Sequence, residues 1–217
     1  VHKESPAGKE TEGKSSAGIF SQDIINQLNV VFSRMEGNLQ LDLHLDSRPV
    51  SQELKGYMTE LEKYTEKLTV QESNSASDSA ALLPFVEVLT ASGEKTGLAF
   101  HGVTGGHEFT SFILGLYNAA GPGQPLDPAI RERILAIDHK VHMQILVSLS
   151  CTMCPDLVVA AQRIASLNLL VTAEVYDIAH FPDLKEKYNV MSVPCLIINQ
   201  DQVTFGKKNI PQLLELL

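Results

Sequence analysis

The chain has few cysteines, few basic residues and no long apolar segment, and each shortage excludes a class of protein. Only three of its 217 residues are cysteines. A secreted disulfide scaffold would have more, so we expect a reducing compartment, the cytoplasm. No apolar run is long enough to span a membrane, and no cleavable signal pattern is visible. The net charge is −9 and the basic residues are not clustered, which excludes nucleic acid as an expected partner.

The sequence also lacks the glycine pattern of a dinucleotide site. No Gly-x-Gly-x-x-Gly follows a predicted strand, so we expect the chain itself to bind no cofactor. The hydrophobic fraction of 44% is nevertheless enough for a large core, in one large or two small domains.

The first 20 residues differ in composition from the rest. Residues 3–18 are rich in Lys, Glu, Ser, Gly and Pro and offer almost nothing to bury, so residues 1–20 are interpreted as a flexible linker. Because Val1 is not a methionine, we expect a piece of a longer protein with a folded part upstream. A disordered natural or tagged N-terminus is the alternative.

Two segments, 21–120 and 125–217, repeat one order of predicted elements around a break at Gly121–Pro125. The first half predicts helices near 24–35, 50–64 and 109–116, and strands at 39–45, 68–72, 85–90 and 97–100. The second half predicts helices near 130–137, 154–165, 184 and 210–217, and strands at 141–149, 169–176, 195–198 and 202–205. An X-Pro pair, Leu83–Pro84 or Val193–Pro194, introduces the third strand of each half. The sequence therefore predicts an α/β protein made of two similar folds.

The most informative motif is Cys151-Thr152-Met153-Cys154-Pro155, which lies between a predicted strand and a predicted helix. The free amide groups and the dipole at a helix N-terminus stabilise a thiolate. Two intervening residues let the second thiol close a small ring, which indicates dithiol–disulfide exchange. Cys151 is predicted to attack and Cys154 to resolve the mixed disulfide, with Pro155 in the first helical turn. A zinc site is the alternative, but two further ligands are not evident.

The repeat is chemically asymmetric. At the position of the cysteines the first half has Asp46-Ser47-Arg48-Pro49 and no thiol. We therefore expect a redox-inactive first fold and a redox-active second fold, placed back to back.

This arrangement resembles the thioredoxin fold, and the doubling resembles one family in particular. The likeness is carried by four segments in order, residues 106–111, 148–151, 154–156 and 189–194. It extends from about Ile24 to the end of the chain. The chain is similar to the thioredoxin-like module of the flavoprotein (F) subunit of alkyl hydroperoxide reductase, in which two thioredoxin folds are fused and only the second carries cysteines.

The resemblance implies electron transfer from a flavin- and NADH-dependent disulfide reductase to a peroxiredoxin. FAD and NADH would bind to the reductase, which is either a separate partner or the part upstream of Val1. The linker-like start favours the second arrangement.

The resemblance also assigns roles to Pro194 and Glu108. The Val193–Pro194 bond is expected to be cis and to shape a groove beside the sulfurs, although most X-Pro bonds are trans. Glu108 is expected to reach from the first half to the second as the base that deprotonates the resolving thiol. Its alternative is a glutamate favoured by the helix dipole. His107 is assigned no chemistry.

Two positions depart from the pattern of the family. Cys195 follows the proline where relatives carry a small apolar residue, and we expect it to pack as a small hydrophobe. Thr152-Met153 replaces a dipeptide that contains histidine. Without an imidazolium between the cysteines the thiolate is less stabilised, so the couple is expected to be reducing.

Two alternative functions follow from the same residues. One is a general glutaredoxin-like or thioredoxin-like protein-disulfide reductase, which would differ in its electron donor. The other is a docking module without catalysis, against which the intact Cys151 and Cys154 argue.

Overall fold

The fold is known from a computed structural model that describes residues 18–73 and 82–217. Most of the predicted linker, residues 1–17, lies outside these ranges. The linker boundary at residue 20 includes one packed side chain, since Phe20 is buried and its ring lies 5.0 Å from that of Phe109. The packed part of the chain therefore includes Phe20.

The helices and strands follow the predicted order in both halves. The first half contains α1 (Gln22–Arg34), β1 (Leu39–His44), α2 (Pro49–Glu62), β2 (Leu68–Glu72), β3 (Phe85–Thr90), β4 (Lys95–His101) and α3 (Glu108–Ala120). The second half contains α4 (Pro128–Leu135), β5 (Val141–Val147), α5 (Cys154–Leu167), β6 (Val171–Asp177), α6 (Pro182–Lys187), β7 (Cys195–Ile198), β8 (Gln202–Phe205) and α7 (Ile210–Leu214).

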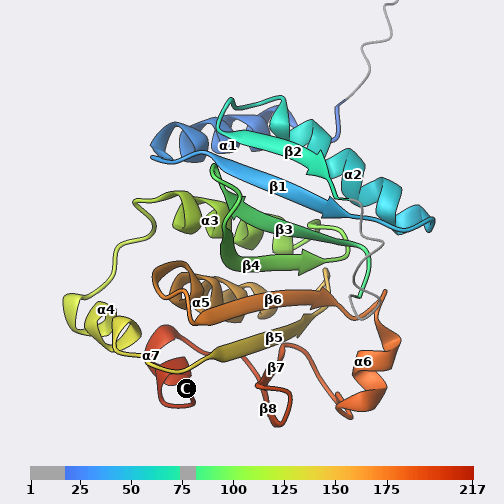
Figure 1. Cartoon of the computed structure of the whole chain (residues 1–217). Helices are drawn as coiled ribbons and strands as arrows, with labels where there is room; N and C mark the ends of the chain where they lie inside the picture. Colours follow the sequence, from blue (N-terminus) through green and yellow to red (C-terminus); the bar gives the residue numbers. More distant parts are fainter. Residues whose placement is uncertain (1–17, 74–81) are drawn as a thin grey trace, which may run out of the picture.

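All eight strands form one continuous sheet in the order β2-β1-β3-β4-β6-β5-β7-β8 (Figure 1). Each half contributes one parallel pair, β1 with β2 or β5 with β6, followed by two antiparallel pairs. The halves meet where β4 pairs in parallel with β6, from Leu98 opposite Ala173 to His101 opposite Tyr176. The expectation of two folds back to back is therefore wrong, because the folds lie edge to edge and share hydrogen bonds.

Side chains alternate in direction along each strand, so the sheet has two different faces. On one face Leu39, Leu41 and Leu43 of β1 join a core that continues through both halves. Because side chains alternate along a strand, Asp42 and His44 point to the other face. The main core contains residues of α1, α2, α3, α4, α5 and α7, so these helices cover one face of the sheet.

Helices α3 and α5 pack against each other on the core face, so an element of the first half lies against the helix that follows the cysteines. A Cβ on Gly115 of α3 would overlap the side chain of Gln162 of α5. Gln162 in turn donates a hydrogen bond to the Ser111 carbonyl at 3.4 Å. The absence of a side chain at position 115 thus permits the close approach of the two helices.

The opposite face carries α6 and a small second core around Phe181 and Leu184. A row of stacked rings crosses this face from the first half to the second. The ring centroids are separated by 4.1 Å from His44 to Phe85, 4.6 Å from Phe85 to His101 and 4.0 Å from His101 to Tyr176. The row therefore links β1, β3, β4 and β6 side chain to side chain.

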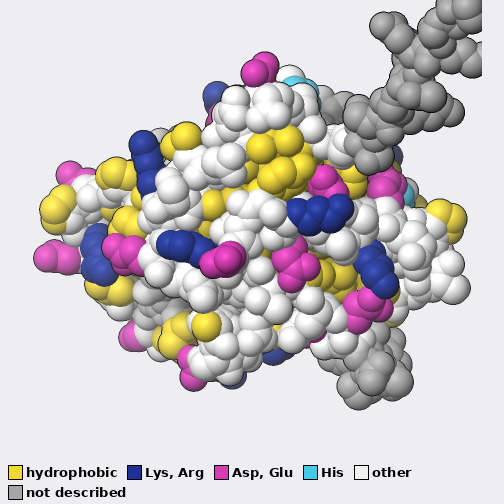
Figure 2. Space-filling view, turned by 90° about the horizontal axis from the view of Figure 1, so that it is seen from above, with side chains coloured by type: hydrophobic (Ala, Val, Ile, Leu, Met, Phe, Trp, Pro, Cys, Tyr) yellow, Lys and Arg dark blue, Asp and Glu magenta, His cyan; other side chains and the backbone are white. Residues whose placement is uncertain are grey.

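Charges of both signs are mixed on the surface. The view from above shows basic side chains lying next to acidic ones, with no large patch of one sign (Figure 2). Lys63 with Glu60 and Lys55 with Glu72 are two such pairs. Among the helices of the described ranges, none combines the length and apolarity needed to cross a bilayer.

Candidate functional site: a disulfide at the edge of the sheet

Cys151 and Cys154 are joined by a disulfide, with their Cα atoms 5.6 Å apart. The predicted strand was expected to reach Leu149, but β5 ends at Val147 and residues 148–153 form the connection to α5. The helix begins at Cys154 with Pro155 in its first turn, as expected. Cys151 therefore lies one turn ahead of the helix, facing its N-terminus.

The two sulfurs differ in their access to solvent. Cys151 is half-buried, whereas Cys154 is fully buried in the main core. The Cys154 backbone N–H donates to the Cys151 Sγ at 3.1 Å. In the reduced protein this amide and the α5 dipole stabilise negative charge on Cys151. The geometry agrees with Cys151 as the attacking thiol and Cys154 as the resolving one.

A proline loop lies against Cys151. The Val193–Pro194 peptide bond is cis, as expected, and so is the Leu83–Pro84 bond at the corresponding place in the first half. The Val193 carbonyl oxygen lies 3.9 Å from the Cys151 Sγ. The Pro194 carbonyl is held by the N–H of Gly206 at 3.0 Å. The Val193 carbonyl therefore lies directly against the accessible sulfur.

Glu108 is the first residue of α3 and is completely buried. A glutamate that only interacted favourably with the helix dipole, the alternative given above, would not need to be buried. One carboxylate oxygen accepts from the Ser111 hydroxyl, and the other, Oε1, has no hydrogen-bond partner among the described residues. Burial raises the pKa of Glu108 to about 7, an effect that the Ser111 hydrogen bond opposes. The side chain is thus tuned to exchange a proton near neutral pH.

The start of α3 is attached to the loop that carries the cysteines. The His107 N–H donates to the Leu149 carbonyl at 2.9 Å, two residues ahead of Cys151. Gly106 has φ +55°, and a Cβ there would lie 2.5 Å from the same carbonyl oxygen. Only glycine permits this approach. His107 thus contributes a backbone contact to this connection.

Cys195 is fully buried on the opposite face of the sheet, in the small core with Tyr176 and Phe181. Burial raises the pKa of its thiol to about 11. The residue therefore packs as a small hydrophobe, as expected.

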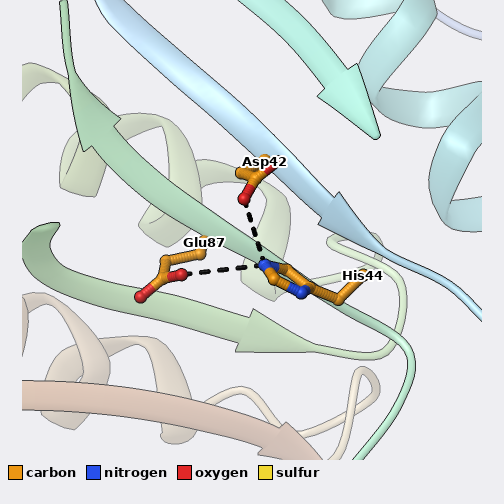
Figure 3. Close-up of side chains that lie close together, drawn as sticks. All are labelled: Asp42, His44 and Glu87. Carbon is orange, nitrogen blue, oxygen red and sulfur yellow. Dashed lines mark ion pairs between the residues drawn. The ribbon is translucent and has the colours of Figure 1, made fainter. Parts of the chain in front are cut away.

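A separate group of possible metal ligands lies on the same opposite face, in the first half. Ligand atoms of Asp42, His44 and Glu87 are all within 4.8 Å of one another. The carboxylates of Asp42 and Glu87 lie 3.2 and 3.7 Å from the His44 Nε2 (Figure 3). Lys95 also lies 2.9 Å from Glu87. Because Lys95 pairs with Glu87 and the His44 imidazole lies between the two carboxylates, we interpret the group as an ion-pair cluster.

Sequence reasoning named Val193 but missed two other contributors to the site, the Leu149 carbonyl and the Ser111 hydroxyl. The Leu149 carbonyl is a backbone group and leaves no signal in side-chain chemistry. Ser111 is three residues after Glu108, the spacing at which helical side chains meet, so the pattern could have indicated it.

Comparison with known proteins agrees with this architecture. The thioredoxin domain family matches residues 141–216, the second half. A protein disulfide oxidoreductase from Aeropyrum pernix is 22% identical with a TM-score of 0.77, over 90% of this chain and 91% of that chain. At this identity the likeness concerns the fold.

Two further proteins match this chain with higher sequence identity. The AhpF protein of alkyl hydroperoxide reductase from Staphylococcus aureus is 30% identical over 92% of this chain, which spans 38% of that relative's length. The NTD_N/C domain of alkylhydroperoxide reductase AhpF from Enterococcus faecalis is 36% identical with a TM-score of 0.87, over 91% of this chain and 99% of that domain. The doubled fold, the single Cys-x-x-Cys and these matches show that the chain belongs to the family of AhpF N-terminal domains, and that it is a thiol–disulfide oxidoreductase of the thioredoxin type.

Proposed function

We propose that the chain relays electrons from an NADH-dependent flavoprotein reductase to a peroxiredoxin. The observation that carries the proposal is the unequal pair of cysteines, in which Cys151 is half-buried and Cys154 is fully buried. Family membership supports the choice of donor and acceptor. The FAD and the NADH site belong to the reductase, either in the same polypeptide or in a partner, and the reducing cytoplasm is the compartment in which such a relay works.

Exchange takes place in two steps. The Cys151 thiolate attacks one sulfur of the partner disulfide, which forms a mixed disulfide and releases the partner's other sulfur as a thiolate. Cys154 then loses its proton and attacks the Cys151 Sγ. This step closes the Cys151–Cys154 disulfide and releases the partner's second sulfur. Two electrons pass to the partner, and a donor dithiol reverses the sequence to restore the reduced chain.

Cys154 needs a base because it is buried and reacts only as a thiolate. We propose Glu108 for this role. Its carboxylate is buried at the start of α3, next to the loop that carries Cys151, and its pKa of about 7 lets it hold either protonation state. Strand β5, which precedes the cysteines, offers no carboxylate, so the first half would supply the group that the second half lacks.

A reconstituted assay tests the function. Purified chain is added to an AhpF-type flavoprotein reductase from which this domain has been deleted, together with NADH, a peroxiredoxin and hydrogen peroxide. NADH oxidation at 340 nm should depend on the chain, and Cys151→Ser should abolish it. Cys195→Ser, which replaces a thiol outside the exchange path, is the matched control and should retain the activity.

Two other donors separate the alternatives. Faster reduction of the chain by glutathione, or by thioredoxin reductase with NADPH, would favour a general protein-disulfide reductase. Stimulation of the peroxidase by Cys151→Ser at the wild-type level would show a docking module that carries no electrons.

A further inference from the structure

A groove of about 790 Å³ runs along α5 from the residues that directly follow Cys154. At its near end lie Pro155 and Asp156, which directly follow Cys154, and Lys207, whose Nζ is 3.6 Å from Asp156. Asp156, Val159, Ala160 and Arg163 of α5 form its length. These positions recur at three- and four-residue intervals and thus share one face of the helix. The groove therefore begins at the first turn of α5, directly after Cys154 in the sequence.

Arg163 lines the far end of this groove and is only 6% exposed. A buried arginine nearly always has a carboxylate or several acceptors around it. In the described part of the chain, however, Arg163 forms no ion pair, its side chain donates no hydrogen bond, and its buried Nε has no partner. The guanidinium remains charged at all relevant pH values. The folded chain thus holds an uncompensated positive charge in the groove.

The surroundings add to this charge. Burial lowers the pKa of Arg163, the positive charge of Arg131 on α4 lowers it further, and Tyr117 opposes these two effects. Lys207 and Lys208 also line the groove, and Asp156 is its single carboxylate. This cationic lining occurs on a chain whose net charge is −9. Charge complementarity therefore points to an anionic occupant.

The remaining lining is largely apolar and includes Leu114, Leu126, Ile130, Val159 and Ile210. A small free anion would leave these side chains without contacts, whereas a peptide with apolar side chains would cover them. From Pro155 to Arg163 the helix rises about 12 Å, at about 1.5 Å per residue. An extended chain covers that length with about four residues, at about 3.3 Å each.

We propose that Arg163 binds the carboxylate of an extended segment of the disulfide partner. The acidic residue lies about four positions from the reacting cysteine of that partner, and the residues between them are apolar. A charge-assisted, two-pronged contact with the carboxylate fixes the register of the segment along α5. The inference rests on the proposed function, because it concerns the segment whose disulfide Cys151 attacks.

Synthetic peptides test the specificity. Each carries one cysteine as a mixed disulfide with 2-thiopyridone, and an aspartate two, four or six positions away on either side. The matched peptide has asparagine in place of aspartate. The reduced chain transfers two electrons to the mixed disulfide, giving peptide thiol, 2-thiopyridone and the Cys151–Cys154 disulfide. Release of 2-thiopyridone at 343 nm gives kcat/KM.

The wild-type chain should prefer aspartate over asparagine by about tenfold, with the maximum at the four-residue spacing. Arg163→Met should reduce this ratio to near one. Arg133→Gln should keep the wild-type ratio, because Arg133 on α4 pairs with Glu215 at 3.1 Å and does not line the groove.

Thermal stability separates a binding arginine from a structural one. Because the charge of Arg163 is unpaired in the free chain, Arg163→Met should leave the Tm unchanged or raise it. A large loss of stability would show a structural role and overturn the proposal. It would also be overturned by an aspartate preference that persists in Arg163→Met, or by competition from inorganic phosphate without any aspartate preference. Failure to reduce any peptide, with asparagine or aspartate, would instead refute the proposed function.

Discussion

The His107 N–H of the first half donates to the Leu149 carbonyl of the second half at 2.9 Å. This hydrogen bond joins the start of α3 to the loop that leads to Cys151. It places a thiol-free half in direct contact with the redox centre, and the position of the buried Glu108 depends on it. Changes in the first half should therefore alter exchange at the disulfide.

Gly106→Ala should impair both stability and exchange. A Cβ at this position would lie 2.5 Å from the Leu149 carbonyl oxygen, and φ is +55°. The left-handed conformation alone costs alanine about 1 kcal/mol, and the collision adds to it. We expect a loss of about 2 kcal/mol in denaturant unfolding, together with slower reduction of a protein disulfide such as insulin. Gly105→Ala is the matched control, since a Cβ there would lie 3.4 Å from the Tyr57 hydroxyl and should be tolerated. Equal effects of the two substitutions would contradict the role of the Leu149 contact.

Glu108→Gln should change the pH dependence of stability. The folded chain keeps the proton of Glu108 up to about pH 7, whereas the unfolded chain loses it near the ordinary pKa of 4.5. Stability therefore decreases as the pH rises between these values and levels off above them. The contribution of Glu108 to this decrease is about 3 kcal/mol. Urea unfolding at pH 4 to 8 should show that Glu108→Gln removes this decrease in stability. The control Glu53→Gln, at an exposed position, should leave the decrease unchanged.

The same substitution should also alter exchange kinetics. In the wild-type chain the resolving step should accelerate with a midpoint near pH 7, as Glu108 ionises. Stopped-flow measurement of the resolving step should show a slower rate in Glu108→Gln and no midpoint near pH 7. An unchanged rate and profile would remove Glu108 from the mechanism.

Gly97→Ala should weaken the junction of the two halves. Gly97 of β4 has φ +85°, and its Cβ would lie 2.7 Å from the Val171 carbonyl oxygen of β6. Gly93 has nearly the same φ, +86°, but open space around it. Because both substitutions introduce the same backbone strain, the difference in free energy of unfolding between them isolates the collision at the junction. We expect Gly97→Ala to be less stable by at least about 1 kcal/mol. Equal stability of the two variants would show that β4 and β6 can separate at little cost.

Cys195 should not react under native conditions. Its thiol is fully buried and its pKa is raised to about 11, so iodoacetamide at pH 8 should modify Cys151 of the reduced chain rapidly and Cys195 only after unfolding. Mass spectrometry of tryptic peptides over time measures both rates. A Cys195-containing disulfide after peroxide treatment would contradict this prediction.

The redox potential should be that of a reductant. The side chains between the cysteines, Thr152 and Met153, carry no charge that would stabilise the Cys151 thiolate. Equilibration with glutathione or dithiothreitol buffers, followed by thiol trapping, should give a potential closer to that of thioredoxin, about −270 mV, than to that of DsbA, about −120 mV. Thr152→His should make the couple more oxidising, since an imidazolium there stabilises the thiolate. A wild-type potential near that of DsbA would refute the reasoning.

Local patterns were sufficient to predict most of the elements and the disulfide. Cys151 and Cys154 are three residues apart, and the alternation in β1 and β5 determines which side chains enter the core, so these features depend on near neighbours in sequence. The cis bond at Pro194 followed from the family resemblance.

Relations between distant segments were not predictable in the same way. The pairing of β4 with β6 is made by backbone groups, and nothing in either strand specifies its neighbour. The burial of Glu108 depends on how α3 meets the loop before Cys151, which only the assembled fold determines. Arg163 was a signal that the sequence analysis did not use, since it is the single charged residue of the helical segment 157–165, which apart from Gln162 is apolar.

The parallel junction also has a consequence for attempts to isolate the active half. Strand β6 is internal only because β4 covers it from Leu98 to His101. Excision of residues 125–217 would expose an unpaired row of N–H and C=O groups along β6, which is the kind of edge through which proteins aggregate. The thiol-free half would thus be needed as a permanent cover for its neighbour, quite apart from any part it has in chemistry.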